Sequence, residues 1–329
     1  HRGQGFPRSG QGLRPVSRVL PLVCATGYPF ADAWRAALQA ALPEERIAAL
    51  ETLDADERAD CDVAIVANPD PRALATLPRL KWVHSVWAGV ERLVADLQAS
   101  PVQIVRLVDP QLADTMAEAV LAWTLYLHRD MPRYARQQAA SQWLEHDYLP
   151  AQRKTVALLG LGALGLAAAA RLRAAGFQLT GWSRSRNAVP GMQCFAGDAE
   201  LPALLAGADI LVCLLPLTPE TEGLLDAKAL AQLRPGAALI NFARGAIIDD
   251  AALRAALDAQ QLRHAVLDVF RTEPLPADQW QWQHPQVTVL PHISGPTNRQ
   301  TAAAIVAANI RRFRASGALP TVVDKQRRY

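Results

Sequence analysis

Three glycines after an apolar run constrain the fold of this chain more than any other feature. Gly160, Gly162 and Gly165 have the G-x-G-x-x-G spacing, between the strand-like residues 156–159 and a helical Ala/Leu pattern. A second short strand begins at Gln178 and completes a βαβ unit of the length that dinucleotide sites use. The glycines would permit a tight turn, close approach of a pyrophosphate and close helix packing, in that order. The pattern predicts dinucleotide binding; a purely structural turn and another nucleotide ligand are the alternatives.

The end of the second strand bears on the identity of the dinucleotide. An NAD site usually has an acidic residue there, which holds the ribose 2′-hydroxyl. This chain instead has Ser183, Arg184 and Ser185, followed by Arg186, and no carboxylate. Arg184 can pair with a 2′-phosphate while a serine hydroxyl donates to it. These residues favour NADP(H) over NAD(H), with a solvated basic turn as the alternative.

Length, charge and cysteine spacing narrow the class of protein. A chain of 329 residues that is 50% hydrophobic can bury a large core and has the length of two domains. The net charge is only +3 without a long Lys/Arg run, which argues against nucleic acid as a partner. Apolar stretches stay shorter than the roughly twenty residues that cross a bilayer, so no membrane association is expected. Cys24, Cys61, Cys194 and Cys213 lack C-x-x-C spacing and indicate free buried thiols in a reducing, cytoplasmic compartment, with neither disulfides nor a metal site.

The segment before the dinucleotide unit is interpreted as a tail followed by a small α/β domain. Residues 1–15 are polar and aperiodic, and we interpret them as a disordered tail or an expression remnant. Runs typical of strands follow at residues 19–23, 63–66, 82–86 and 104–108, with helical spacing over residues 30–42. Ala88 and Gly89 come directly after one of these runs, where they form either a carboxylate cradle or an ordinary turn. Trp87 beside them is either a pocket wall or a core aromatic.

Apolar runs also recur after the dinucleotide unit, and polar side chains follow them. The runs are residues 210–215, 238–242, 265–268 and 287–290. The last three precede Arg244, Glu273 and His292, respectively. In a doubly wound sheet the carboxyl ends of the strands lie along one edge, which is the ligand crevice. These three side chains can therefore converge although they are far apart in sequence.

Four motifs occur in a fixed order along the chain. They are Gly160-x-Gly162-x-x-Gly165, Asn241-x-x-Arg244-Gly245, Asp268-x-Phe270-x-x-Glu273-Pro-Leu275 and Pro291-His292. Together they resemble the signature set of the D-2-hydroxyacid dehydrogenases. The glyoxylate/hydroxypyruvate reductase A branch is indicated in particular by Gly181-Trp-Ser-Arg-Ser185, Trp87-Ala-Gly-Val90 and the tail Val323-Asp324-Lys-Gln-Arg-Arg-Tyr329. The resemblance covers essentially everything after residue 16.

This resemblance implies an α/β fold in which a Rossmann dinucleotide-binding domain is inserted into a flavodoxin-like substrate domain. The substrate domain would comprise residues 16–110 and 294–329, and the NAD(P)-binding domain residues 111–293. The implied cofactor contacts are Gly160, Gly162, Ala163, Leu164, Gly165, Ser183, Arg184, Ser185, Leu215, Pro216, Thr221, Phe242, Ala243 and Asp268. For Asp268 the resemblance implies contact with the nicotinamide carboxamide, whereas the local sequence leaves a strand-end cap as the alternative.

Reduction of a 2-keto acid needs a hydride donor, an acid near the carbonyl oxygen and a cation for the carboxylate. His292 is the member of this set that can supply a proton near neutral pH. Glu273 would orient the imidazole and favour its charged form. Arg244 would bind the carboxylate or the ketone oxygen through its planar fork. The resemblance implies the same three roles, while each residue taken singly also has a structural interpretation.

The substrate contacts expected are Trp87, Ala88, Gly89, Arg244 and His292. Trp87 stands where the family usually has a smaller residue, which would favour short acids. Our leading hypothesis is cytosolic, NADPH-dependent reduction of glyoxylate to glycolate or of hydroxypyruvate to D-glycerate, with NAD use left open. A bulkier 2-keto acid and a non-catalytic dinucleotide-sensing protein of the same fold are the alternatives. The resemblance also implies a homodimer, for which the predominantly helical residues 112–140, broken near Pro132, are a candidate interface.

Overall fold

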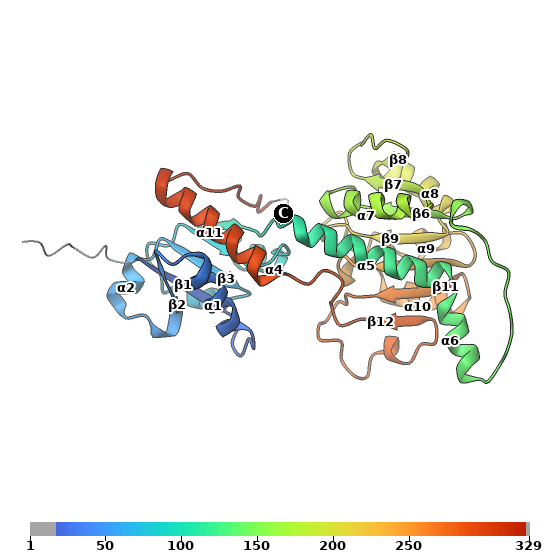
Figure 1. Ribbon diagram of the computed structural model, residues 1–329, viewed down its shortest axis with the longest axis horizontal. Coiled ribbons are helices and arrows are strands. Elements are labelled where there is room, and N and C mark those ends of the chain that lie inside the picture. The colour runs from blue at the N-terminus through green and yellow to red at the C-terminus, as the bar shows by residue number, and fades with distance from the viewer. Residues whose placement is uncertain (1–17, 327–329) are drawn as a thin grey trace, which may run out of the picture. The chain divides into compact units, whose positions relative to one another are not determined.

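The computed structural model describes residues 18–326, which divide into two units (Figure 1). One unit comprises residues 18–107 and 299–323, and the other comprises residues 108–298 with residues 324–326. The sequence predicted boundaries near residues 110 and 294, a few positions from these divisions, and extended the first domain to residue 329, whereas the first unit ends at Val323. The predicted tail of residues 1–15 lies outside the described residues.

The first unit is built on a parallel sheet of five strands. They are β1 (Val19–Cys24), β2 (Arg46–Ala49), β3 (Val63–Ala67), β4 (Trp82–Ser85) and β5 (Gln103–Val105). Their order, β2-β1-β3-β4-β5, is that of the flavodoxin-like fold. β1 lies between β2 and β3, with Val19 opposite Arg46 and Leu22 opposite Ile65. The flavodoxin-like prediction is therefore confirmed.

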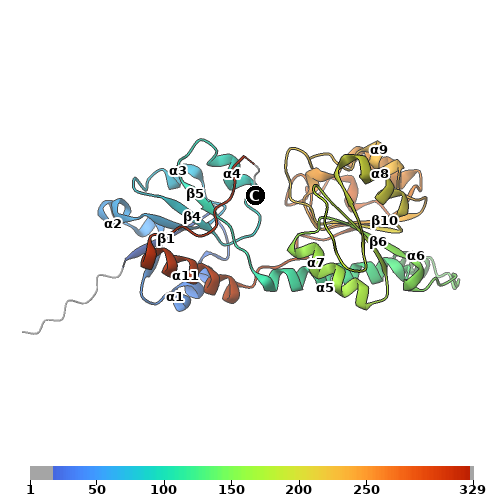
Figure 2. The same ribbon diagram turned by 90° about the horizontal axis from the view of Figure 1, so that it is seen from above.

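Helices cover both faces of this sheet (Figure 2). α1 (Ala31–Ala41) and α11 (Arg299–Ser316) share one apolar cluster with the strands, in which Trp34 and Ile310 are 2% and 0% exposed. The 3₁₀ turn η1 (Leu50–Thr52), α3 (Pro71–Leu74) and α4 (Glu91–Asp96) contribute to a second cluster. Because α11 follows residues 108–298 of the second unit in sequence, a segment from near the carboxyl terminus completes the first unit.

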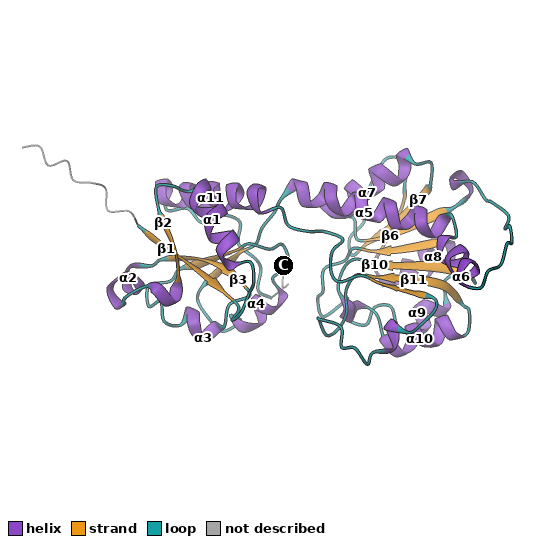
Figure 3. Ribbon diagram, turned by 60° about the horizontal axis from the view of Figure 1, so that its bottom comes forward, coloured by secondary structure: helices purple, strands orange, loops and turns teal. Residues whose placement is uncertain are grey.

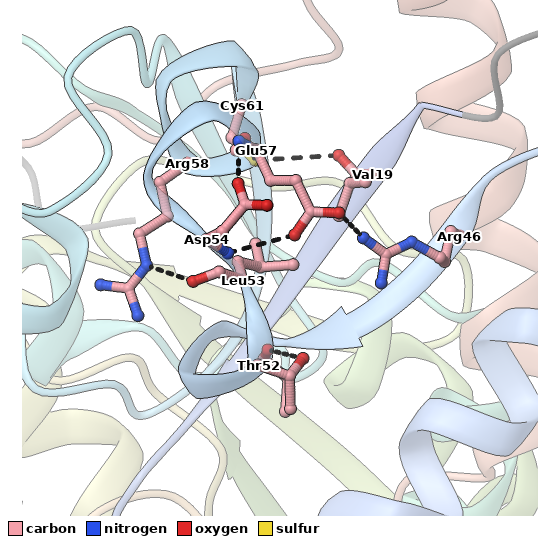
Figure 4. A network of polar contacts seen from close by, with 9 residues as sticks. Val19, Arg46, Thr52, Leu53, Asp54, Glu57, Arg58 and Cys61 are labelled. Atoms are coloured by element: carbon pink, nitrogen blue, oxygen red, sulfur yellow. Dashed lines mark hydrogen bonds and ion pairs between the residues drawn. The ribbon is translucent and has the colours of Figure 1, made fainter.

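The short helix α2 (Ala55–Asp60) is fixed by its first turn rather than by burial (Figure 4). Asp54 accepts a hydrogen bond from the Glu57 backbone N–H at 2.9 Å, and the Glu57 carboxylate accepts one from the Asp54 N–H at 3.2 Å. This reciprocal capping box satisfies amides that the helix itself leaves unpaired. Arg46 at the start of β2 also pairs with Glu57, which ties the helix to the sheet edge.

The second unit is built on a parallel sheet of seven strands. They are β6 (Thr155–Leu159), β7 (Gln178–Ser183), β8 (Gln193–Ala196), β9 (Ile210–Cys213), β10 (Ala237–Asn241), β11 (Leu262–Leu267) and β12 (Val287–Val289). The order is β12-β11-β10-β9-β6-β7-β8. Counted from β6, it is the Rossmann order 3-2-1-4-5-6 with β12 added at one edge. The predicted Rossmann fold is confirmed, and the order reverses between β6 and β9.

Helices also cover both faces of the larger sheet (Figure 3). They are α5 (Pro110–His128), α6 (Met131–Ala139), α7 (Ala163–Ala174), α8 (Gly197–Gly207), α9 (Ala227–Ala231) and α10 (Asp250–Asp258), with 3₁₀ turns η2 (Ala151–Arg153), η3 (Gly245–Ile247) and η4 (Trp280–Trp282). α5 and α7 share one apolar cluster with the sheet, and α8, α9 and α10 share the other. The predicted break near Pro132 is confirmed, because α5 ends at His128 and Pro132 lies in the first turn of α6, where a proline is tolerated.

The runs expected to be strands are strands, although β5 already ends at Val105. β2 and β8 had no counterpart in the sequence analysis. Both are four-residue strands at a sheet edge, where pairing with a neighbour outweighs the local pattern. In the described residues, no helix has the length and apolarity needed to span a bilayer, and no cluster of His, Cys, Asp and Glu is suited to hold a metal.

The four cysteines are free thiols. The predicted burial is confirmed for Cys61 and Cys213 but is wrong for Cys24 and Cys194, which are partly exposed. Burial raises the pKa of Cys213 to about 12 and those of Cys24 and Cys61 to about 11. The three thiols with raised pKa values are therefore protonated and poorly nucleophilic at neutral pH.

Candidate active site

The turn that joins β6 to α7 has the sterics that the glycine spacing predicts. Gly160 has φ +103°, and a Cβ there would lie 2.9 Å from the Leu214 carbonyl oxygen. A Cβ at Gly165 would lie 1.9 Å from the Gly160 carbonyl oxygen, so only glycine lets the helix approach the turn. Gly162 caps α7, and a Cβ there would meet nothing within 4 Å. That open space at a helix N-terminus suits an approaching pyrophosphate.

This turn lies where the strand order reverses, which is the usual ligand position in such sheets. Ala163 and Leu164 form the first turn of α7, and Leu215 and Pro216 follow the adjacent strand β9. The Thr221 hydroxyl donates to the Pro216 carbonyl oxygen at 2.7 Å and accepts from the Thr218 N–H at 2.8 Å. Thr221 is 9% exposed, so in this structure it shapes the loop after β9. Its contact with a cofactor stays a prediction.

The turn after β7 is organised by its own side chains. The Ser183 hydroxyl donates to the Ser185 carbonyl oxygen at 2.7 Å and accepts from the Asn187 amide at 2.7 Å. Arg186 forms an ion pair with Glu200, and the Arg184 side chain is exposed just beyond the end of β7. Ser183 therefore closes the turn, and contact of Arg184 and Ser185 with a phosphate stays a prediction.

Glu273 and His292 meet beyond the carboxyl ends of β11 and β12. The His292 Nδ1 atom lies 2.7 Å from Glu273 Oε2, and Glu273 Oε1 accepts a hydrogen bond from the Phe270 N–H at 2.8 Å. His292 Nε2 makes no hydrogen bond with any described residue. Because Nδ1 faces a carboxylate, Nε2 is the atom that can serve a ligand. His292 also has φ +55°, a left-handed conformation that few non-glycine residues adopt and in which histidine is enriched.

Arg244 follows β10 in a tightly held loop. Asn241 donates from Nδ2 to the Arg244 carbonyl oxygen at 3.1 Å, and Arg244 Nη1 donates to the Ala243 carbonyl oxygen at 2.7 Å. A Cβ at Gly245 would lie 2.1 Å from the Phe270 carbonyl carbon, so this loop packs directly on the segment that leads to Glu273. The structure thus brings the Arg244 and Glu273 loops together, as the sheet topology predicted. Phe242 and Ala243 are each 4% exposed.

Asp268 at the end of β11 anchors the loop that carries His292. Its Oδ1 accepts from the Ile293 N–H at 2.7 Å, its Oδ2 accepts from the Ser294 N–H at 2.9 Å, and the residue is 1% exposed. These contacts support the structural alternative that the sequence left open. Contact with a nicotinamide carboxamide stays a prediction.

Within the His292–Glu273 pair, the pKa of the histidine is raised and that of the glutamate is lowered relative to their ordinary values. The hydrogen bond to Glu273 raises the pKa of His292 above its ordinary 6.5, against the opposing effects of partial burial and the Arg244 charge. Partial burial would raise the pKa of Glu273, but hydrogen bonds from His292 and from the Phe270 N–H hold it below its usual value. His292 therefore keeps its proton to a higher pH than a free histidine does.

Trp87, Ala88 and Gly89 belong to the five-stranded unit, whereas the other predicted site residues belong to the seven-stranded unit. Trp87 is partly exposed and packs edge-on against Tyr28, with ring centroids 5.7 Å apart. The indole also contacts the core cluster of α1 and α11. A pocket-wall role and a core role are thus both compatible with its packing.

Comparison with known proteins decides the family. Residues 121–294 match the family model described as D-isomer specific 2-hydroxyacid dehydrogenase, NAD binding domain. The chain belongs to this dehydrogenase family. It is 39% identical over 305 residues to glyoxylate/hydroxypyruvate reductase A of Serratia proteamaculans, which covers 90% of this chain and 96% of that protein.

Solved structures of the family extend the likeness to nearly the whole chain. A D-isomer specific 2-hydroxyacid dehydrogenase from Xanthobacter autotrophicus Py2, in complex with NADPH and MES, is 39% identical with a TM-score of 0.87, over 94% of this chain and 99% of that one. A second structure is that of an NADPH-dependent glyoxylate/hydroxypyruvate reductase from Sinorhizobium meliloti, in complex with NADP and sulfate. It is 32% identical with a TM-score of 0.87, and the match covers 95% of this chain and 100% of that one.

Three residues of this 2-hydroxyacid dehydrogenase shape the site but had no assigned role in the sequence analysis. Asn241, 1% exposed, fixes the Arg244 loop from both sides, because its Oδ1 also accepts from the Ala243 N–H at 3.1 Å. Gly245 permits the close approach to Phe270. Asn187 holds the Ser183 hydroxyl. A polar residue that ends a buried strand was the available signal for Asn241; for Asn187 the sequence offered none.

Proposed function

We propose that this chain reduces short 2-keto acids with NADPH, converting glyoxylate to glycolate and hydroxypyruvate to D-glycerate. The observation that carries the proposal is the His292–Glu273 pair, 2.7 Å apart at the carboxyl edge of a Rossmann sheet in a chain of the 2-hydroxyacid dehydrogenase family. Relatives of 39% and 32% identity that carry the glyoxylate/hydroxypyruvate reductase name support the choice of substrates.

In the proposed reaction His292 donates a proton from Nε2 to the carbonyl oxygen. NADPH, when bound at the β6–α7 turn, supplies the hydride that the carbonyl carbon accepts, so the two additions yield the alcohol. Glu273 holds the imidazole and stabilises its charged form until the proton leaves. Arg244 binds the carboxylate or the oxygen on which negative charge develops. Ala88 and Gly89, in the five-stranded unit, stay predicted contacts of the substrate carboxylate.

The pH dependence of reduction should follow the protonation of His292. We expect kcat/KM for the keto acid to fall as the pH rises through the pKa of His292, which lies above 6.5. Glu273→Gln removes the largest cause of that raised pKa. The alkaline limb of the pH–rate profile, in which kcat/KM falls with rising pH, should therefore move to lower pH. Rate profiles of both enzymes measure this, and an unmoved limb would refute the role of Glu273.

The same pair makes stability depend on pH. The pKa of His292 is raised on folding, so its contribution is fully present below about pH 6.5 and is lost as the pH rises through the folded value. The pKa of Glu273 is lowered, so its contribution is present above about pH 4.5 and is lost as the pH falls through the folded value. The pair therefore stabilises the fold most strongly between these limits.

NADPH is the proposed cofactor, with Arg184 as the residue that distinguishes it from NADH. Related structures contain NADPH or NADP, and no acidic side chain lies in the turn after β7. Arg184→Ala should lower kcat/KM for NADPH by about 10- to 100-fold, because a charge-assisted contact to the 2′-phosphate is lost. NADH lacks that phosphate and serves as the internal control. Equal loss for both cofactors would contradict the assignment.

Oxidation of NADPH and NADH with glyoxylate, hydroxypyruvate, pyruvate and phenylpyruvate tests the function directly. We expect fast oxidation of NADPH with glyoxylate and hydroxypyruvate only. Comparable turnover of phenylpyruvate would indicate a bulkier substrate, against the packing of Trp87 on Tyr28. Cofactor binding without any turnover would indicate a dinucleotide sensor.

We also propose a homodimer located in the cytoplasm. The support for the dimer is a group of exposed apolar side chains in the segment that follows α6. Trp143 is 94% exposed, Leu144 56% and Tyr148 60%. Surfaces of this kind are typical of protein interfaces. The mass of the protein in solution, measured by sedimentation, distinguishes a dimer from a monomer.

A further inference from the structure

The turn after β4 is held through both backbone polar groups of Trp87. The Trp87 N–H donates to the Ser85 hydroxyl oxygen at 3.1 Å, and the Trp87 carbonyl oxygen accepts from the Leu107 N–H at 3.1 Å. The N–H groups of Ala88 and Gly89, which come next, make no hydrogen bond within the described part of the chain. Because the Trp87 carbonyl lies in the same planar peptide unit as the Ala88 N–H, its hydrogen bond with Leu107 sets the direction of the first of the two amides to which we assign the substrate carboxylate.

A buried imidazole lies behind this turn. His84 Nδ1 is 2.9 Å from the Ser85 carbonyl oxygen, and His84 Nε2 is 2.9 Å from Asn309 Nδ2 on α11. His84 is 0% exposed, and burial lowers its pKa to about 4, so the ring is neutral. A carbonyl oxygen only accepts, so Nδ1 carries the proton and Nε2 accepts from the Asn309 amide. A single tautomer thus satisfies both contacts.

We propose that Asn309, His84 and Ser85 form a hydrogen-bond chain that positions the Ala88–Gly89 amides for the substrate carboxylate. The inference rests on the proposed function, since it names positioning residues for that same site. Asn309 stands 225 positions after His84 and reaches it only because α11 returns to the first sheet. The helix that completes the unit thereby also fixes the end of β4.

The chemistry of this region favours a positioning role over simple packing. The residue cluster around this hydrogen-bond chain is apolar, and Trp82, Val306 and Ile310 in it are all 0% exposed. A buried polar group in such surroundings is costly unless it is hydrogen-bonded, and apolar side chains of similar volume would fill the space without that cost. The hydrogen-bond chain from Asn309 through His84 instead ends on the Ser85 carbonyl oxygen. The hydroxyl of the same serine accepts the hydrogen bond from the Trp87 N–H.

Asn309→Leu tests the proposal in the full-length protein. The leucine keeps the volume but leaves His84 Nε2 without a donor. We expect KM for glyoxylate and the inhibition constant of oxamate, a keto-acid analogue, each to rise about fivefold to tenfold. The dissociation constant of NADPH, measured by fluorescence, should be unchanged. Unchanged KM and oxamate inhibition in a folded Asn309→Leu protein would overturn the proposal.

A control and a second variant separate positioning from general destabilisation. Ile310→Val removes one buried methyl from the same helix and should lower the melting temperature without changing KM for glyoxylate. Ser85→Ala removes the acceptor of the Trp87 N–H and should raise KM even if Asn309→Leu fails to fold. An equal rise in KM for Ile310→Val would show that loss of stability alone is responsible. If the wild-type protein reduces no 2-keto acid, the proposed function fails instead.

Discussion

His292→Asn should lower kcat for keto-acid reduction by about 100- to 10,000-fold, the range that a general acid contributes. Asparagine keeps the backbone in place, because it tolerates the positive φ of 55° that His292 adopts, whereas alanine would be strained there. It cannot, however, deliver a proton near neutral pH. The effect should be seen in kcat with saturating NADPH and in single-turnover experiments.

Binding of NADPH separates a chemical defect from a structural one. The dissociation constant of NADPH should be nearly unchanged in His292→Asn, because the β6–α7 turn is intact. His284→Asn is the matched control: this histidine also pairs with a carboxylate, at 3.1 Å from Asp258, but lies outside the proposed site. Its kcat should stay close to that of the wild type. Retention of more than about a tenth of the wild-type turnover by His292→Asn would contradict proton donation by this residue.

Arg244→Lys should lower kcat/KM for glyoxylate by about 100- to 1,000-fold although the charge is kept. Arg244 uses Nη1 to donate to the Ala243 carbonyl oxygen at 2.7 Å, and a guanidinium presents its five N–H donors in a fixed planar fork. A lysine has a single ammonium group and loses this planar, bidentate geometry. Both KM for glyoxylate and the inhibition constant of oxamate should therefore rise.

Arg271→Lys provides the matched control, because Arg271 is exposed and pairs with Glu222 at 3.6 Å. Its kcat/KM should be close to that of the wild type. Arg244→Ala adds a test through pH: the positive charge of Arg244 lowers the pKa of His292, so its removal should move the alkaline limb of the residual activity to higher pH. A small effect of Arg244→Lys on kcat/KM would exclude bidentate binding of the substrate.

The parts of the site that the sequence predicted depend on short-range sterics and on residue type. A side chain at Gly165 would collide with Gly160 five positions earlier, so the spacing alone indicates the turn. Histidine is the side chain suited to proton transfer near neutral pH, which identified His292. Edge strands such as β2 escaped prediction, because pairing with a neighbouring strand, rather than a local pattern, makes them strands.

The sequence by itself therefore determined the dinucleotide turn through its spacing, and the two sheet folds through the family resemblance that the ordered motifs carry. The acid–base roles of His292 and Glu273 stay predictions. The tertiary structure decided what individual polar groups do. Asp268 anchors Ile293 and Ser294, 25 and 26 positions away, and His84 pairs with Asn309 on a helix from the far end of the chain. Hydrogen bonds between residues far apart in sequence form only where the sheets and helices bring those residues together. The local sequence around each residue does not show which distant residue will be its partner.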